Sequence, residues 1–84
     1  MPKVEVYTWT ICPYCVRAKN LLKNKGVAFQ EINIDGNDAE FEALKKRTGM
    51  KTVPQIFIND KLVGGYSDLA ALEQEGKLDA LLGQ

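Results

Sequence analysis

The pair Cys12 and Cys15, separated by Pro13 and Tyr14, is the part of this sequence best suited to chemistry near neutral pH. No other cysteine occurs among the 84 residues, and histidine is absent. The lack of histidine excludes Ser-His and Cys-His hydrolytic dyads, and it removes the commonest metal ligand and proton carrier. Two thiols at this spacing can form and break a disulfide, so the sequence points to thiol redox chemistry.

The elements expected around the two cysteines favour a reactive thiolate at Cys12. Residues 3–8 alternate apolar and polar side chains and predict a strand, and residues 13–25 follow with helical periodicity. Cys12 then stands at a helix start, where unpaired backbone N–H groups and the helix dipole stabilise negative charge. Residues three apart are neighbours on a helix, so Cys15 can reach Cys12, and Pro13 fits the first helical position.

The rest of the chain alternates strands and helices. We predict a strand over 27–34, a helix over 38–48, a strand over 55–59, a turn at Asn59-Asp60, a strand over 61–63, a helix capped by Ser67 or Asp68, and a last short helix near Leu78 to Leu82. A helical crossover makes the first two strands parallel, whereas the hairpin is antiparallel. We therefore expect an α/β fold, β-α-β-α-β-β-α, with a mixed four-stranded sheet flanked by helices.

Composition and charge exclude several classes of partner. Apolar residues make up 45% of the chain and charged residues 26%, as in an ordinary globular domain. Eleven basic and eleven acidic side chains cancel, which leaves no broad field for nucleic acid or an anionic membrane. No signal peptide or membrane span is evident. We expect a reducing compartment, the cytoplasm or an organelle stroma, where Cys-x-x-Cys is more often catalytic or metal-binding than structural.

A structural staple and a zinc site are two other interpretations of the cysteine pair. Closing a loop of roughly four residues gives only about 2 kcal/mol in the chain-entropy model. A zinc site needs two more soft or imidazole ligands, which only a second copy of the chain could supply. We therefore prefer a redox role, with Cys12 as the nucleophile and Cys15 as its partner, and expect no metal site.

Three motifs together resemble the glutaredoxin family of the thioredoxin superfamily. They are Cys12-Pro13-Tyr14-Cys15 after the first strand, Thr52-Val53-Pro54 before the third, and Gly64-Gly65-Tyr66-Ser67-Asp68 at the third helix. The resemblance covers nearly the whole chain. It implies a thioredoxin-like fold, one glutaredoxin domain over residues 1–84, a dithiol of the Cys-Pro-Tyr-Cys type, and a cis peptide bond before Pro54 in a loop that faces the dithiol.

The resemblance also implies glutathione as the reducing co-substrate, with no permanently bound cofactor. Lys51 resembles the cation that holds the glycyl carboxylate, and the Val53 backbone can pair with the cysteinyl part like an added strand. The N–H groups of Ser67 and Asp68 suit the γ-glutamyl carboxylate, and the Asp68 carboxylate suits the ammonium. The full set expected to bind glutathione is Tyr14, Lys51, Thr52, Val53, Pro54, Gly65, Ser67 and Asp68.

Each of these residues also has a plainer interpretation. Thr52 and Pro54 can be loop residues, Lys51 a solvated lysine, Ser67 or Asp68 a helix cap, Gly64-Gly65 a hairpin end, and Tyr14 a core residue. Trp9 departs from the family, which often has a lysine three residues before the nucleophile. Trp9 either shields the end of the first strand or offers an aromatic surface to glutathione or partner proteins.

We therefore expect a monomeric, glutathione-dependent thiol-disulfide oxidoreductase that reduces protein disulfides and protein–glutathione mixed disulfides. One rival is a glutaredoxin-like reductant recharged by thioredoxin reductase, against which the expected glutathione pocket argues. Another is an iron–sulfur carrier, a dimer that shares a cluster between two Cys12 thiolates and two glutathiones. In the family, the stiffness of a proline such as Pro13 disfavours that role.

Overall fold

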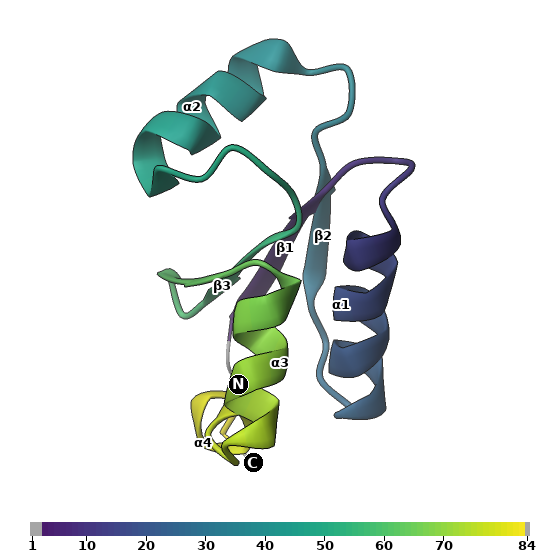
Figure 1. Cartoon of the computed structure of the whole chain (residues 1–84), viewed down its shortest axis with the longest axis vertical. Coiled ribbons are helices and arrows are strands. Elements are labelled where there is room, and N and C mark those ends of the chain that lie inside the picture. Colours follow the sequence, from purple (N-terminus) through teal and green to yellow (C-terminus); the bar gives the residue numbers. More distant parts are fainter. Residues whose placement is uncertain (1–2, 84) are drawn as a thin grey trace.

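The computed structural model describes residues 3–83 and has the expected order of elements, including the short last helix predicted near Leu78 to Leu82 (Figure 1). The strands are β1 (Val4–Thr8), β2 (Gln30–Asn33), β3 (Gln55–Ile58) and β4 (Lys61–Gly64), and the helices are α1 (Pro13–Asn24), α2 (Asp38–Thr48), α3 (Tyr66–Gln74) and α4 (Leu78–Leu81). Within the described residues, no helix is long and apolar enough to cross a membrane.

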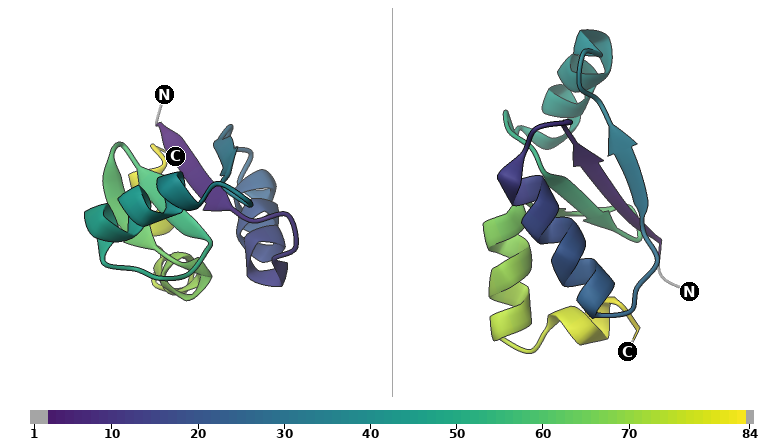
Figure 2. Two further views of the ribbon diagram at one scale, coloured as in Figure 1. Left: turned by 90° about the horizontal axis from the view of Figure 1, so that it is seen from above. Right: turned by 90° about the vertical axis from the view of Figure 1, so that its right-hand side faces the viewer.

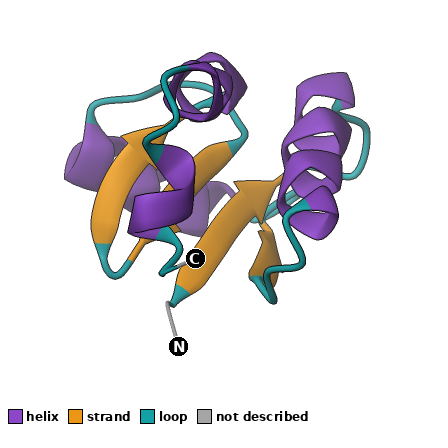
Figure 3. Cartoon of the chain, turned by 90° about the horizontal axis from the view of Figure 1, so that it is seen from below, coloured by secondary structure: helices purple, strands orange, loops and turns teal. Residues whose placement is uncertain are grey.

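The four strands form one mixed sheet in the order β2-β1-β3-β4. β1 pairs with β2 in parallel and with β3 antiparallel, and β3 pairs with β4 antiparallel. The sheet lies between helices, as Figures 2 and 3 show. The expectation of an α/β thioredoxin-like fold with a mixed four-stranded sheet is therefore confirmed.

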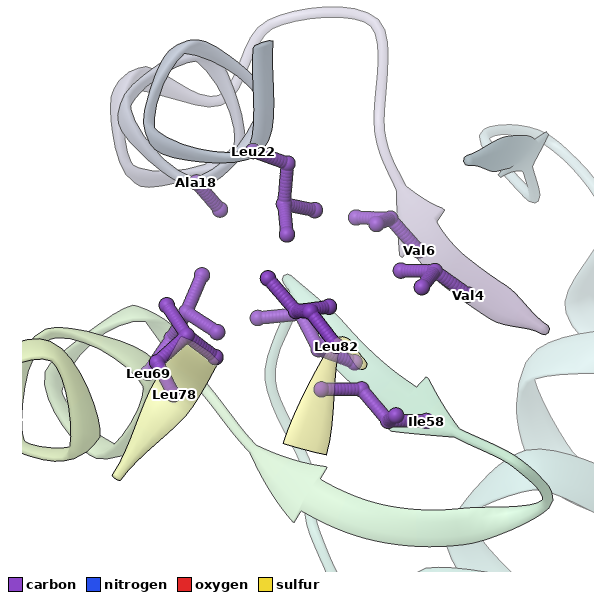
Figure 4. Packing of buried hydrophobic residues seen from close by; sticks show 9 residues of the cluster. Val4, Val6, Ala18, Leu22, Ile58, Leu69, Leu78 and Leu82 are labelled. Carbon is purple, nitrogen blue, oxygen red and sulfur yellow. The ribbon is translucent and has the colours of Figure 1, made fainter. Parts of the chain in front are cut away.

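Strand alternation on β1 and β3 builds a core on each face of the sheet. On one face, Val4, Val6, Ile56 and Ile58 pack against α1, α3 and α4. Figure 4 shows Val4 and Val6 of this cluster facing Leu22 of α1. The other face carries Tyr7 and Phe57, which pack against Leu44 of α2. Side chains buried in this way contribute about 1.5–3 kcal/mol each, so the two central strands are held from both sides.

Among the predicted strands, the second differs most from the structure. The second strand is shorter than 27–34, because only residues 30–33 pair with β1. The Val27 N–H instead donates to the Leu22 carbonyl and helps to end α1, with Gly26 at a φ of 72°. The turn at Asn59-Asp60 is confirmed, since both residues have positive φ (53° and 67°), as a tight hairpin requires.

A polar cluster fixes the end of β1 just before the cysteine loop. The buried Thr8 hydroxyl donates to Glu31 Oε2 on β2 at 2.8 Å. Lys19 Nζ of α1 donates to the same oxygen at 3.0 Å. These two hydrogen bonds, with Thr8 the larger cause, hold the pKa of Glu31 below its ordinary value. The cluster joins three elements and so limits where the following loop can lie.

Candidate active site

Cys12 is the N-cap residue of α1, and the helix begins at Pro13 as predicted. The Cys15 N–H donates to Cys12 Sγ at 3.1 Å, and the two cysteines are joined in a disulfide with their Cα atoms 5.2 Å apart. Cys12 is partly exposed, whereas Cys15 is only 1% exposed. Once the disulfide is reduced, the N–H and the helix dipole favour a thiolate at Cys12, the sulfur that an incoming molecule can reach.

The loop between α2 and β3 lies opposite this sulfur. Cys12 Sγ is 3.9 Å from the Val53 carbonyl oxygen, and the peptide bond between Val53 and Pro54 is cis. Both features were expected from the family resemblance, and both are found. The loop therefore presents the Val53 backbone to whatever binds beside Cys12.

A cavity of about 380 Å³ separates this loop from the start of α3. It is lined by Tyr14, Met50, Thr52, Val53, Pro54, Gly65, Tyr66, Ser67 and Asp68. Of the eight residues predicted to bind glutathione, seven line the cavity and Lys51 does not. Lys51 is an exposed residue of the same loop. Tyr66 belongs to the motif from Gly64 to Asp68 but was not among the residues predicted to bind glutathione. Met50 also lines the cavity, and no sequence pattern singles it out.

An aromatic pair forms one wall of the cavity. The rings of Tyr14 and Tyr66 are stacked with centroids 6.2 Å apart, and the Arg17 guanidinium lies 5.3 Å from the Tyr14 ring centroid. Tyr14 is 56% exposed, so the alternative that it packs in the core is wrong. A flat exposed ring at this position can pack against a peptide-sized ligand.

The start of α3 corrects the predicted cap. The helix begins at Tyr66 with Gly65 as N-cap. A cap at Ser67, the earlier of the two predicted caps, would have started the helix two residues later. Asp68 still helps to cap, but from the third helical position, because its Oδ2 accepts the Gly65 N–H at 3.0 Å. Gly64 has a φ of 123°, and a Cβ there would lie 2.8 Å from Asp68 Cγ, so only glycine fits.

Gln55 holds the loop between α2 and β3 through its side-chain amide, and it was not among the predicted site residues. Its side chain is fully buried, and Nε2 donates to the Thr52 carbonyl at 2.9 Å and to the Met50 carbonyl at 3.3 Å. Both acceptors belong to cavity-lining residues outside any strand or helix. Gln55 therefore gives these loop carbonyls the partners that regular structure would otherwise supply.

Trp9 points to a different part of the molecule from the cavity. Its ring packs edge-on against Phe41 of α2, with centroids 5.3 Å apart and planes at 83°. Trp9 is 36% exposed and does not line the cavity. This contact favours the interpretation that Trp9 shields the end of β1 over the one that it forms a surface for glutathione. Across residues 3–83, no cluster of three or more potential metal ligands is found.

A family model described as Glutaredoxin matches residues 4–63 of this chain. The chain belongs to the glutaredoxin family. Glutaredoxin 3 of Escherichia coli strain K12 is 57% identical over 82 residues, covering 98% of this chain and 99% of that protein. A glutaredoxin of Pseudomonas aeruginosa is 56% identical over 82 residues, covering 98% of each chain. With its Cys12–Cys15 pair, this chain is a dithiol glutaredoxin, a glutathione-dependent thiol-disulfide oxidoreductase.

Solved glutaredoxin structures share the fold closely. A buckwheat glutaredoxin–glutathione complex matches with a TM-score of 0.93 and 35% identity, covering 98% of this chain and 77% of that one. The dithiolic glutaredoxin 2-C-Grx1 of Trypanosoma brucei brucei matches with a TM-score of 0.88 and 42% identity, covering 95% of this chain and 86% of that one. The described cavity therefore belongs to a glutaredoxin fold.

Replacing Gln55 by methionine should weaken the use of glutathione. Methionine has a similar volume but donates no hydrogen bond, so the carbonyls of Met50 and Thr52 lose their shared partner. Two neutral hydrogen bonds are worth roughly 0.5–1.5 kcal/mol each, and we expect kcat/KM for glutathione to fall by about tenfold. Steady-state kinetics measure the change. An unaltered kcat/KM in a folded variant would show that Gln55 serves stability alone.

Proposed function

We propose that this glutaredoxin reduces protein disulfides and protein–glutathione mixed disulfides through a Cys-Pro-Tyr-Cys dithiol, in which Cys12 attacks and Cys15 resolves. The observation that carries this proposal is the position of Cys12: it is the accessible sulfur, it accepts the Cys15 N–H, and it lies beside the Val53 carbonyl. Residues 1–84 act as a single glutaredoxin domain.

Reduction of a protein–glutathione mixed disulfide uses only Cys12. The Cys12 thiolate attacks the glutathione sulfur, a new disulfide forms, and the electron pair of the old bond leaves on the protein sulfur. A second glutathione thiolate then attacks the glutathione sulfur on Cys12, which forms oxidised glutathione and releases the Cys12 thiolate. A stabilised thiolate is a good leaving group, so the helix start favours this last step.

Reduction of a protein disulfide also uses Cys15. The Cys12 thiolate attacks one substrate sulfur and leaves the other as a thiolate. The Cys15 thiolate then attacks Cys12 Sγ, releases the second substrate thiolate, and forms the Cys12–Cys15 disulfide seen in the structure. Two glutathione molecules reduce that disulfide and become oxidised glutathione.

The cavity supports a specific position for glutathione. The Val53 backbone pairs with its cysteinyl part, and Tyr14, Thr52, Pro54 and Gly65 form the walls. The N–H groups of Ser67 and Asp68 belong to the first turn of α3, which leaves them free of intrahelical partners, and they receive the γ-glutamyl carboxylate. The glutathione complex of the buckwheat protein supports a tripeptide at such a site.

Charges at the two ends of glutathione complete its recognition. The Asp68 carboxylate binds the γ-glutamyl ammonium while it caps Gly65, since a carboxylate accepts several hydrogen bonds. Lys51 acts from outside the cavity, where its long side chain reaches the glycyl carboxylate. Glutathione is thus a co-substrate that binds and is released in each catalytic cycle.

We place the working enzyme, as a monomer, in a reducing compartment, the cytoplasm or an organelle stroma. A Cys-x-x-Cys pair at a helix start, with Cys12 partly exposed, is suited to catalytic cycling where thiols stay reduced. Its partners are glutathione and proteins that carry disulfides or glutathione adducts; nucleic acid and membranes are not among them.

Serine variants of the two cysteines separate the two routes. Cys15→Ser should keep turnover of glutathione mixed disulfides, because that cycle needs only Cys12 and free glutathione. It should lose most reduction of protein disulfides, because the trapped partner is no longer released by Cys15. Cys12→Ser should abolish both activities. Assays with both substrates measure this, and an active Cys12→Ser beside an inactive Cys15→Ser would reverse the assigned roles.

Two variants of Asp68 separate its charge from its capping role. Asp68→Asn keeps an oxygen that accepts the Gly65 N–H but loses the charge, whereas Asp68→Ala loses both. Since Asp68 is exposed, we expect kcat/KM for glutathione to fall about threefold to tenfold in Asp68→Asn and further in Asp68→Ala. Wild-type kinetics in Asp68→Asn would show that the Asp68 charge does not bind glutathione and that Asp68 only caps the helix.

A further inference from the structure

Exposed apolar side chains are concentrated around the dithiol. Among the described residues, the exposed large hydrophobic side chains are Trp9 (36%), Ile11 (88%), Tyr14 (56%), Val16 (50%), Leu62 (40%) and Leu81 (44%). Four of these six lie between residues 9 and 16. Tyr14 belongs to the cavity wall, and Trp9 packs on Phe41. Ile11 and Val16 remain without a structural explanation.

Val16 lies on the side of α1 away from the cavity. Successive residues turn by about 100° around a helix axis, so Tyr14 and Val16 are separated by about 200° and face opposite ways. Tyr14 stacks on Tyr66 of α3. Lys19 is about 60° from Val16 on the same projection, and it binds Glu31 of β2. Val16 therefore stands on the β2 side, whereas the cavity is on the α3 side.

Ile11 and Val16 both lie close to Cys12 along the chain. Ile11 immediately precedes Cys12, and the Val16 N–H donates to the Cys12 carbonyl at 3.1 Å, one helical turn along. Isoleucine and valine are among the residue types most often buried, yet here they are 88% and 50% exposed. We call these two side chains the Ile11–Val16 surface.

The covalent chemistry decides what covers this surface. In the protein-disulfide route, the substrate cysteine is bonded to Cys12, which holds its neighbouring residues close to the surface around Cys12. Ile11 and Val16 are exposed apolar side chains outside the cavity and within four residues of Cys12 in the chain. The position proposed for glutathione is in the cavity, on the other side of α1. A polypeptide tethered through one sulfur, with an apolar side chain beside its cysteine, would place that side chain against Ile11 and Val16 and remove both from water.

We propose that the Ile11–Val16 surface docks the polypeptide of protein-disulfide substrates and favours those with an apolar residue beside the reacting cysteine. This inference rests on the proposed function and assigns the protein substrate a contact that glutathione does not use. The covalent step is unchanged: Cys12 attacks, the substrate disulfide breaks, and its other sulfur leaves as a thiolate.

The double variant Ile11→Thr with Val16→Thr tests the surface. Threonine keeps the β-branched shape and replaces a methyl or ethyl group with a hydroxyl, and both sites are exposed, so the fold should persist. Leu62→Thr is the matched control, since Leu62 is 40% exposed in a groove between β4, α3 and α4 that shares neither surface residue. Thermal unfolding of all proteins checks the fold, and the single variant Ile11→Thr serves if the double one is unstable.

Two synthetic peptides with an internal disulfide supply the probe, one with valine and one with serine on both sides of each cysteine. The wild type should reduce the valine peptide with a kcat/KM about tenfold higher, in keeping with two apolar contacts. The double variant should lose that preference, while Leu62→Thr should keep it. Turnover of the mixed disulfide of glutathione and 2-mercaptoethanol should change less than about twofold in both variants.

Equal kcat/KM values for the two peptides in the wild type would overturn the proposal. So would a preference that the double variant retains, or an equal loss with the peptide and the mixed disulfide. Failure of the proposed function looks different, because the wild-type protein would then turn over neither substrate with glutathione.

Discussion

The hydrogen bond from the Cys15 amide to the Cys12 sulfur depends on a helix that starts at Pro13. Cys12 can cap the helix only because β1 ends at Thr8 and the intervening loop is short. The buried Thr8 hydroxyl, bonded to Glu31, fixes that strand end. The same arrangement exposes one sulfur, buries the other, and points a charge-stabilising helix terminus at the exposed one.

The other half of the site, which consists of the loop before β3 and the start of α3, is positioned by β3. Gln55 starts that strand, and its amide holds two carbonyls of the preceding loop. The antiparallel pairing of β3 with β1 brings this loop across from the cysteines, so that Val53 faces Cys12. The β3–β4 hairpin then leads into α3, whose first turn closes the cavity. The sheet order β2-β1-β3-β4 thus places both halves of the site at one end of the central strands.

Sequence patterns predicted the parts that depend on local rules. Helix α2 (Asp38–Thr48) was predicted to the residue because acidic side chains begin it, basic ones end it, and Gly49 caps it. The contacts that escaped prediction join distant segments: Trp9 with Phe41, Tyr14 with Tyr66, and Gln55 with Met50 and Thr52. The start of α3 was missed because Asp68 caps from inside the helix, which composition alone does not distinguish from an N-cap. The motifs located most of the cavity, but Lys51 lies outside it.

Amide hydrogen exchange on the glutathione adduct tests the central claim, that Cys12 presents its ligand to Val53 and the start of α3. The Cys15→Ser protein would carry either glutathione or a single methylthio group (S–S–CH3) on Cys12, so that both forms contain a disulfide at Cys12. The account predicts slower exchange at the amides of Val53, Ser67 and Asp68 in the glutathione form than in the methylthio form, because the tripeptide gives these N–H groups acceptors. Equal exchange rates at all three amides in the two forms would contradict it.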